Sequence, residues 1–227
     1  MLKYKLLRVN WYSLQIIFME LVMKFTRKLI GISKMLFLIV PFIISCNAKS
    51  QVDQRWLNSW NEANKMKPSK ITSHSRIAPV DEQGKPFIIK GKIYNPDNAP
   101  AKDVFVHAYH RDSKEYDFGK NDSELSTWRL QGWAKTDQNG NFEFKTIRPA
   151  PDHIGREGPH IHFTIVSAKY GRQWAPKVFL SDDPTLTETQ HNDSKKDGKF
   201  GWISEVKEKD GIQYISVNIK LKKSGDF

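Results

Sequence analysis

Short apolar runs follow one another from residue 86 almost to the end of the chain. They are rich in Val, Ile, Phe and Tyr, and several alternate apolar with polar positions, which is the two-residue period of a half-buried strand. Segments containing Asn, Asp, Gly and Pro separate them, as turns require. The runs predict strands at 86–94, 103–110, 141–147, 159–168, 176–180 and 212–221. We therefore expect an all-β domain, an antiparallel β-sandwich, over residues 85–227.

The segments outside these runs are polar. Residues 46–84 have no sustained period, so we expect a tether and an N-terminal arm, in which Trp56 and Trp60 cap the domain through one helical turn. Residues 181–200 are expected to form a surface loop whose charges are solvated. The chain of 227 residues suits one globular domain.

The N-terminal residues 1–45 have the pattern of a secretory leader. From Met23 a basic stretch is followed by an apolar run and then by Cys46. The residues 43–46 resemble the lipobox of bacterial lipoproteins, in which the cysteine is acylated and becomes the new N-terminus. We expect translation from Met23 and a cell-envelope protein anchored by lipid at Cys46, outside the cytoplasmic membrane. An uncleaved anchor is the alternative, but the run is short of the ~20 residues that span a bilayer.

Charge and cysteine content exclude several classes of function. Of the net charge of +11, residues 1–45 carry +6, with seven Lys and Arg and one Glu. The remaining +5 forms no basic stripe interleaved with aromatic residues, so nucleic-acid binding is not expected. Cys46 is the single cysteine, which excludes an intrachain disulfide and a cysteine-based metal cluster. The sequence contains no nucleophile elbow, so a Ser-His-Asp hydrolase is not expected.

The segment Pro159–Phe163 reads Pro-His-Ile-His-Phe. Side chains at positions i and i+2 of a strand point to the same side. We therefore expect the imidazoles of His160 and His162 to lie close enough to share a metal ion. Two exposed histidines on one strand face are the alternative.

Residues 85–184 resemble the intradiol ring-cleavage dioxygenases, the family of catechol and protocatechuate dioxygenases. The opening strands of that family are similar to the segment GKIYNPDNAPAKDVFVHAYH. Its central hairpin and Pro-rich turn are similar to KTDQNGNFEFKTIRPAP, and its iron-binding strand is similar to GPHIHF. The segment KVFLSDDP resembles the one that follows. The resemblance implies the family's β-sandwich and a non-haem Fe(III) held by two tyrosinates and two histidines.

The resemblance assigns His160 and His162 as the imidazole ligands and Tyr116 as the first tyrosinate. A hard ferric ion favours anionic oxygen donors, and such a site has room for a bidentate catecholate. At the second tyrosine the match breaks, because counting from Thr146 places Asp152 there, or His153 if the loop shifts by one residue. One of the two is expected as the fourth ligand.

Three further features of the site follow from the resemblance. The family usually has an arginine three residues before the first histidine, whereas Arg156 stands four before it; we expect this guanidinium to stabilise negative charge on the substrate. Lys177 stands where many members have a polar amide. Trp128, Trp133 and Trp174 either line the pocket or, as is more usual for aromatic residues, belong to the core.

Two functions follow from these observations. The first is a lipid-anchored non-haem iron dioxygenase that cleaves a catechol-like ring between its hydroxylated carbons, with a small aromatic diol and O2 as substrates. The second is a non-catalytic β-sandwich lipoprotein that binds a metal or a ligand on the same scaffold.

Overall fold

The structure is a computed structural model that describes residues 19–20, 52–120 and 123–227. Residues 52–227 form one compact unit. Cys46 and nearly all of the predicted leader lie outside the described residues. The helices of the unit are α2 (Gln54–Lys65), α3 (Glu188–Lys196) and the 3-10 helix η2 (Gly198–Phe200). None of the helices in the described part of the chain is long and apolar enough to cross a bilayer.

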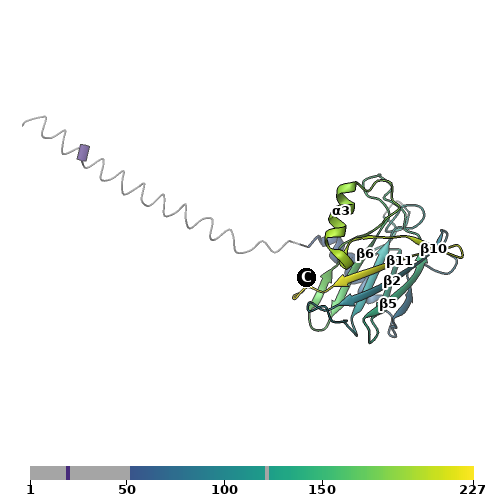
Figure 1. Ribbon diagram of the computed structural model, residues 1–227, viewed down its shortest axis with the longest axis horizontal. Helices are drawn as coiled ribbons and strands as arrows, with labels where there is room; N and C mark the ends of the chain where they lie inside the picture. The colour runs from purple at the N-terminus through teal and green to yellow at the C-terminus, as the bar shows by residue number, and fades with distance from the viewer. Residues whose placement is uncertain (1–18, 21–51, 121–122) are drawn as a thin grey trace, which may run out of the picture. The chain divides into compact units, whose positions relative to one another are not determined.

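The strands form two sheets that pack face to face as a sandwich. The first sheet has the order β1-β5-β2-β11-β10, and Figure 1 shows β5, β2 and β11 side by side. Its strands are β1 (His74–Arg76), β2 (Pro86–Tyr94), β5 (Asn141–Ile147), β10 (Lys207–Lys209) and β11 (Ile212–Lys220).

The second sheet carries the histidine pair. Its order is β4-β3-β6-β8-β9, and β7 also pairs with β6. The strands are β3 (Phe105–His110), β4 (Leu130–Lys135), β6 (His160–Ser167), β7 (Gly171–Trp174), β8 (Val178–Leu180) and β9 (Ile203–Ser204). Strand β6 is thus flanked by β3 on one side and by β8 and β7 on the other.

The predicted sandwich is confirmed, but its sheets are mixed rather than antiparallel. The six predicted strands correspond to β2, β3, β5, β6, β8 and β11. Parallel pairs occur between β1 and β5, between β2 and β11, and between β8 and β9. The reason is the path of the chain: the hairpin of β10 and β11 joins the first sheet through β11, which runs in the same direction as β2.

The main core lies between the two sheets. Alternate residues of β2, including Phe87, Ile89 and Ile93, are buried there, as its two-residue period predicts. From the second sheet, Ile161 and Phe163 enter the same core. Because these two residues flank His162 along β6, the alternation of the strand turns the histidines to the opposite side.

Residues 52–80 were expected to form an irregular arm, but they contain a helix and a strand that pack into the compact unit. Helix α2 has three turns and is capped at its N-terminus by Asp53, whose carboxylate accepts hydrogen bonds from the backbone of Arg55 and Trp56. Trp60, 1% exposed, packs on the outer side of the second sheet. Strand β1 extends the first sheet.

A second aromatic cluster forms where α2 meets that sheet. Trp128 and Trp133 are buried in it, so they are core residues, and the ring of Trp174 contacts Trp56. Trp56 and Trp60 stack with their planes 3° apart and their centroids 5.9 Å apart. The two tryptophans therefore pack on the domain as expected, but the helix that carries them is longer than one turn.

The expectation of a surface loop at 181–200 is wrong. The segment contains α3 and η2, and Figure 1 shows α3 standing outside the sheets. A capping box starts α3: the hydroxyl of Thr187 accepts from the backbone N–H of Gln190, and the amide oxygen of Gln190 accepts from the backbone of Thr187. This Thr-x-x-Gln spacing is a helix-start signal that the polar composition concealed.

Candidate metal centre

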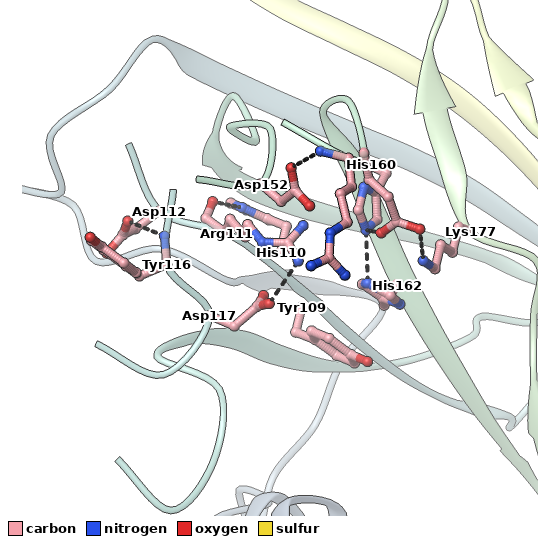
Figure 2. Close-up of polar contacts among 12 residues, drawn as sticks. Tyr109, His110, Arg111, Asp112, Tyr116, Asp117, Asp152, His160, His162 and Lys177 are labelled. Carbon is pink, nitrogen blue, oxygen red and sulfur yellow. Dashed lines mark hydrogen bonds and ion pairs between the residues drawn. The ribbon is translucent and has the colours of Figure 1, made fainter. Parts of the chain in front are cut away.

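The imidazoles of His160 and His162 converge at the start of β6. Their Nε2 atoms lie 2.9 Å apart (Figure 2). His160 is 2% exposed, whereas His162 is half-buried. The sequence prediction that both rings face the same way is confirmed by this contact.

Hydrogen bonding fixes the tautomer of His160. Its Nδ1 lies 2.7 Å from the carbonyl oxygen of Gly158. A carbonyl can only accept, so Nδ1 carries the proton and Nε2 of the neutral ring presents a lone pair. Burial lowers the pKa of both histidines, which favours the neutral rings that a metal ion requires.

Gly158 occupies a position where no side chain fits. A Cβ atom there would lie 1.6 Å from Oδ2 of Asp183, a residue that is 4% exposed. Oδ1 of Asp183 accepts from the backbone N–H and the hydroxyl of Thr185, at 2.9 and 2.8 Å. Asp183, in the loop after β8, therefore packs directly against the backbone that orients His160.

Aromatic stacking holds His162. The ring of Tyr109, its partner across the β3–β6 ladder, stacks on it with centroids 4.5 Å apart and planes within 5°. Trp128 stacks on the other side of Tyr109, at 3.9 Å. The indole N–H of Trp56 donates to the Tyr109 hydroxyl at 3.2 Å. Burial raises the pKa of this phenol, so Tyr109 stays neutral.

Glu157 and Lys177 form an ion pair beside the histidines. Lys177 contacts Oε1 of Glu157, while Oε2 lies 3.5 Å from Nε2 of His160. Burial raises the pKa of Glu157, but the hydrogen bond and charge of Lys177 outweigh it, so the net pKa is lowered and the carboxylate is ionised. The sequence analysis did not single out Glu157, and it noted Lys177 only as a residue standing where many family members have a polar amide.

Arg111 adds a second positive charge. It follows β3 and forms an ion pair with Asp117 at 3.2 Å, and its Nε is buried with no hydrogen-bond partner. Figure 2 places Arg111 between Asp117 and the histidines. Its charge contributes to the lowered pKa values of His160 and His162, behind the larger effect of burial.

Asp152 is a buried loop residue. Its Oδ1 accepts from the backbone N–H of Arg156 at 2.6 Å. Burial raises its pKa, but backbone hydrogen bonds and the charges of Arg111 and Arg156 outweigh this effect, and the net pKa is lowered. Asp152 therefore carries a negative charge that serves the turn it belongs to.

Tyr116 lies apart from the histidine pair. Its backbone N–H donates to Asp112 at 3.1 Å, and its ring lies 5.0 Å from the ring of His153. Figure 2 shows Tyr116 and Asp112 at one end of the view, and His160 and His162 at the other. Of the five predicted ligands, the structure brings the two histidines together and places Tyr116 beside His153. Among the residues that the structure describes, no three or more His, Cys, Asp or Glu side chains are gathered around one point for a metal.

A pocket of about 480 Å³ opens beside the histidine strand. Its walls include Pro159, Phe179 and Leu186, and Arg156 and Glu157 supply charged groups. The ring of Phe179 lies 5.1 Å from that of His160. The pocket can therefore take a small molecule with an apolar body against Phe179, whose ring contacts that of His160.

The sequence analysis did not predict that four residues surround the histidine pair: Tyr109, Arg111, Glu157 and Lys177. Glu157 carried a usable signal, since it stands at the position where the family usually has an arginine. Lys177 was noted as a departure without a role. Tyr109 could be identified only from the pairing of β3 with β6.

Comparisons with known proteins agree with this fold. A family model described as "Dioxygenase" matches residues 64–222. Catechol 1,2-dioxygenase 1 of Acinetobacter lwoffii is 26% identical over 136 residues, which are 51% of this chain and 43% of that protein. The catechol 1,2-dioxygenase of Acinetobacter baylyi is 26% identical over 121 residues, 46% of this chain and 39% of that protein. The chain thus matches less than half the length of these relatives.

Solved structures show the same sandwich. Catechol 1,2-dioxygenase from Acinetobacter sp. ADP1, inhibited by bound mercury, superposes with a TM-score of 0.52 at 17% identity, over 94% of this chain and 87% of that one. The dioxygenase domain of a carbohydrate-binding fusion protein from Streptomyces sp. SirexAA-E gives 0.50 at 16% identity, over 68% and 91%. With a family model that covers most of the sandwich, the chain belongs to the intradiol dioxygenase family.

Proposed function

We propose that the protein is a non-haem iron dioxygenase that cleaves a catechol-like ring between its two hydroxylated carbons, with O2 as co-substrate. The observation that carries the proposal is the pair of Nε2 atoms, 2.9 Å apart, on the family's histidine strand. Two relatives are catechol 1,2-dioxygenases, which act on the same class of diol that we propose here.

The residues present fit a metal ion in part. His160 and His162 are neutral, and the tautomer of His160 leaves its Nε2 lone pair toward His162. The resemblance adds Tyr116 and either Asp152 or His153, and these assignments remain proposals. Bound Fe(III) would chelate the two hydroxyls of the substrate and make the ring reactive toward O2.

The chain's own residues would bind and orient the substrate. The pocket beside Phe179 and Leu186 would hold the apolar ring edge. Arg156 lines that pocket, and we propose that its guanidinium stabilises negative charge on the substrate.

The second candidate function is a binding protein without catalysis. One observation favours it: Tyr116 lies away from the histidines, next to His153. A protein of this kind would bind a metal or a diol and leave the ring intact.

Metal analysis combined with a visible spectrum separates the two functions. Protein produced without residues 1–45 should contain about one iron per chain, absorb visible light through tyrosinate charge transfer, change colour with catechol, and consume O2 with a ring-opened product. His160→Ala and His162→Ala should both abolish iron and ring opening. Iron bound without O2 uptake supports the binding protein, whereas full iron in both histidine variants contradicts the site.

Three further variants test the remaining ligands. Tyr116→Phe should remove the charge-transfer band and leave the fold intact, because it deletes one oxygen atom. Asp152→Ala and His153→Ala separate the two alignments, because the residue that binds the metal lowers the iron content when it is removed. An unchanged band in Tyr116→Phe would exclude Tyr116 as a ligand.

The location of the protein is a separate proposal. We propose that Cys46 carries a lipid anchor that holds the dioxygenase outside the cytoplasmic membrane, on the basis of the basic and apolar stretches that precede it. The cysteine lies outside the described residues, so its support is the sequence alone.

A further inference from the structure

The outer face of the first sheet gathers positive charge from segments that are far apart in the sequence. Ile89 and Phe144 point into the core, so their neighbours along β2 and β5 point outward, and residues paired across a ladder share a side. The helix η2 lies against the same side, because the amide of Asn218 on β11 donates to the carbonyl of Lys199. We name this surface the basic face, and its six cationic residues are Arg76, Lys90, Lys92, Lys145, Lys199 and Lys220.

Acidic residues do not balance these charges. Glu143, the ladder partner of Lys90, lies on the same face, and Asp137 borders it in the turn before β5. Six positive and two negative charges leave the basic face with +4. Residues 46–227 carry +5 in all, with 29 Lys and Arg against 24 Asp and Glu. Most of the net charge of this part of the chain therefore lies on one side of one sheet.

Aromatic rings lie among the lysines. The ammonium groups of Lys199 and Lys92 lie 3.9 and 5.5 Å from the ring centroid of Tyr94. Two further pairs have the same arrangement, each at 5.8 Å: Lys90 with Tyr214 and Lys220 with Phe200. The three rings are half-buried, so each presents an edge at the surface. Rings of this kind beside lysines suit an interface between water and an apolar phase.

The lysines are available to a partner. Lys90 and Lys220 are exposed, and within residues 52–120 and 123–227 neither forms an ion pair. Neighbouring strands lie about 4.8 Å apart, so β1, β5, β2 and β11 span about 14 Å across the face, and seven residues of β2 span about 20 Å along it. Figure 1 shows β5, β2 and β11 side by side. The charges are thus spread over an area rather than along a line.

We propose that the basic face docks on an anionic lipid surface. A plane of headgroups meets all the cations of such an area at once, whereas a linear polyanion follows a single row of them. The sequence before Cys46 predicts a location at a membrane, where such a surface is present. His160 and His162 are on the second sheet and face away from the core, so docking through the first sheet leaves them uncovered.

The test measures sedimentation of the protein with vesicles. The protein lacks residues 1–45, because residues 52–227 form one compact unit with its own core. It should bind vesicles made of equal parts phosphatidylcholine and phosphatidylglycerol, and should not bind phosphatidylcholine alone. Raising the ionic strength from about 0.1 M to about 1 M shortens the Debye length from about 10 Å to about 3 Å and should release it.

A triple variant removes charge from the basic face. Each basic residue near an anionic membrane strengthens binding about fivefold. The variant with Lys90→Gln, Lys92→Gln and Lys220→Gln should therefore bind the mixed vesicles about 100-fold more weakly than the wild type. Thermal unfolding monitored by circular dichroism confirms that it is folded.

A matched control removes the same charge from the side of the second sheet. Lys67 and Lys135 lie 4.8 and 5.9 Å from the ring of Phe105, which reproduces the contacts of the basic face. Lys65 is exposed at the end of α2. The variant with Lys65→Gln, Lys67→Gln and Lys135→Gln should bind the mixed vesicles like the wild type.

A fluorescent label identifies the side that touches the membrane. Ser216 is exposed and is the ladder partner of Lys90, whereas the exposed Ser69 follows α2. In a Cys46→Ser background, an environment-sensitive fluorophore on Ser216→Cys should shift its emission to shorter wavelength with mixed vesicles. The same fluorophore on Ser69→Cys should not shift.

The outcomes separate this proposal from the proposed function. Weak binding by the basic-face variant alone, with an emission shift at Ser216 alone, supports docking through the basic face. Equal weakening by both triple variants overturns it, because attraction would then follow overall charge. Binding to duplex DNA but not to the mixed vesicles overturns it as well. Iron content and O2 uptake report the proposed function, and the basic-face variant should keep the wild-type values of both.

Discussion

Replacing Gly158 by alanine should destabilise the protein through one collision. The φ of Gly158 lies outside the left-handed region, so alanine meets no backbone penalty. Its Cβ would lie 1.6 Å from Oδ2 and 2.5 Å from Cγ of Asp183, whereas packed Cβ atoms do not approach other atoms closer than 3.0 Å. The carboxylate must retreat by about 1.4 Å, which weakens the two hydrogen bonds that its Oδ1 accepts from Thr185.

The magnitude follows from these contacts. Overpacking costs about 1–3 kcal/mol, and weakening the hydrogen bonds to Asp183 adds about 1 kcal/mol, so we expect a loss of about 2–4 kcal/mol for Gly158→Ala. Urea denaturation followed by tryptophan fluorescence measures it. Metal affinity should fall as well, since the Gly158 carbonyl orients His160.

A double-mutant cycle isolates the collision. Asp183→Ala removes the obstacle, so Gly158→Ala should cost less than about 1 kcal/mol in that background, with a coupling energy of about 2 kcal/mol. Effects that add to within about 0.5 kcal/mol would refute the reasoning. Such a result would mean that Gly158 and Asp183 do not compete for the same space.

Three further results are expected. Burial lowers the pKa of His107 and His110 to about 4 from 6.5, so between these values the unfolded chain binds protons that the folded chain does not. The free energy of unfolding should therefore be highest above pH 6.5 and fall toward pH 4, by up to about 1.4 kcal/mol per pH unit for each histidine. A free energy from urea denaturation that does not change over this pH range would contradict this. Trp60→Ala should cost about 3–5 kcal/mol in the same assay, against less than about 0.5 kcal/mol for Met66→Ala at the exposed end of α2. Cys46→Ser should release the protein from membrane fractions, and unchanged fractionation and mass would disprove the anchor.

The strands could be predicted because their burial follows the two-residue period. In β2 and β5 alternate residues enter the core, and the sequence alternates in step. The direction of pairing could not be predicted, because β11 has the same alternation whether it lies parallel or antiparallel to β2. Strand β4 was not predicted, for a local reason: it contains Gly132, which lies against the backbone of Arg76 and interrupts the apolar run.

The candidate site divides in the same way. His160 and His162 are two residues apart on one strand, so a rule of local geometry places them correctly. Tyr116 and His153 stand in loops, and their positions depend on contacts that the spacing does not encode. Glu157 is close in sequence, but its orientation depends on Lys177, twenty residues later and on another segment, which no local pattern relates to it.

The stack of Trp128, Tyr109 and His162 gives the protein an optical reporter of its own site. The indole of Trp128 is separated from the His162 ring by a single phenol, with centroid spacings of 3.9 and 4.5 Å. An ion with unpaired electrons on His162 would lie close enough to shorten the excited-state lifetime of this indole. Trp128 is also buried, so solvent collisions contribute little to its emission. Occupancy of the histidine pair should therefore be readable from intrinsic fluorescence, with no label attached to the chain.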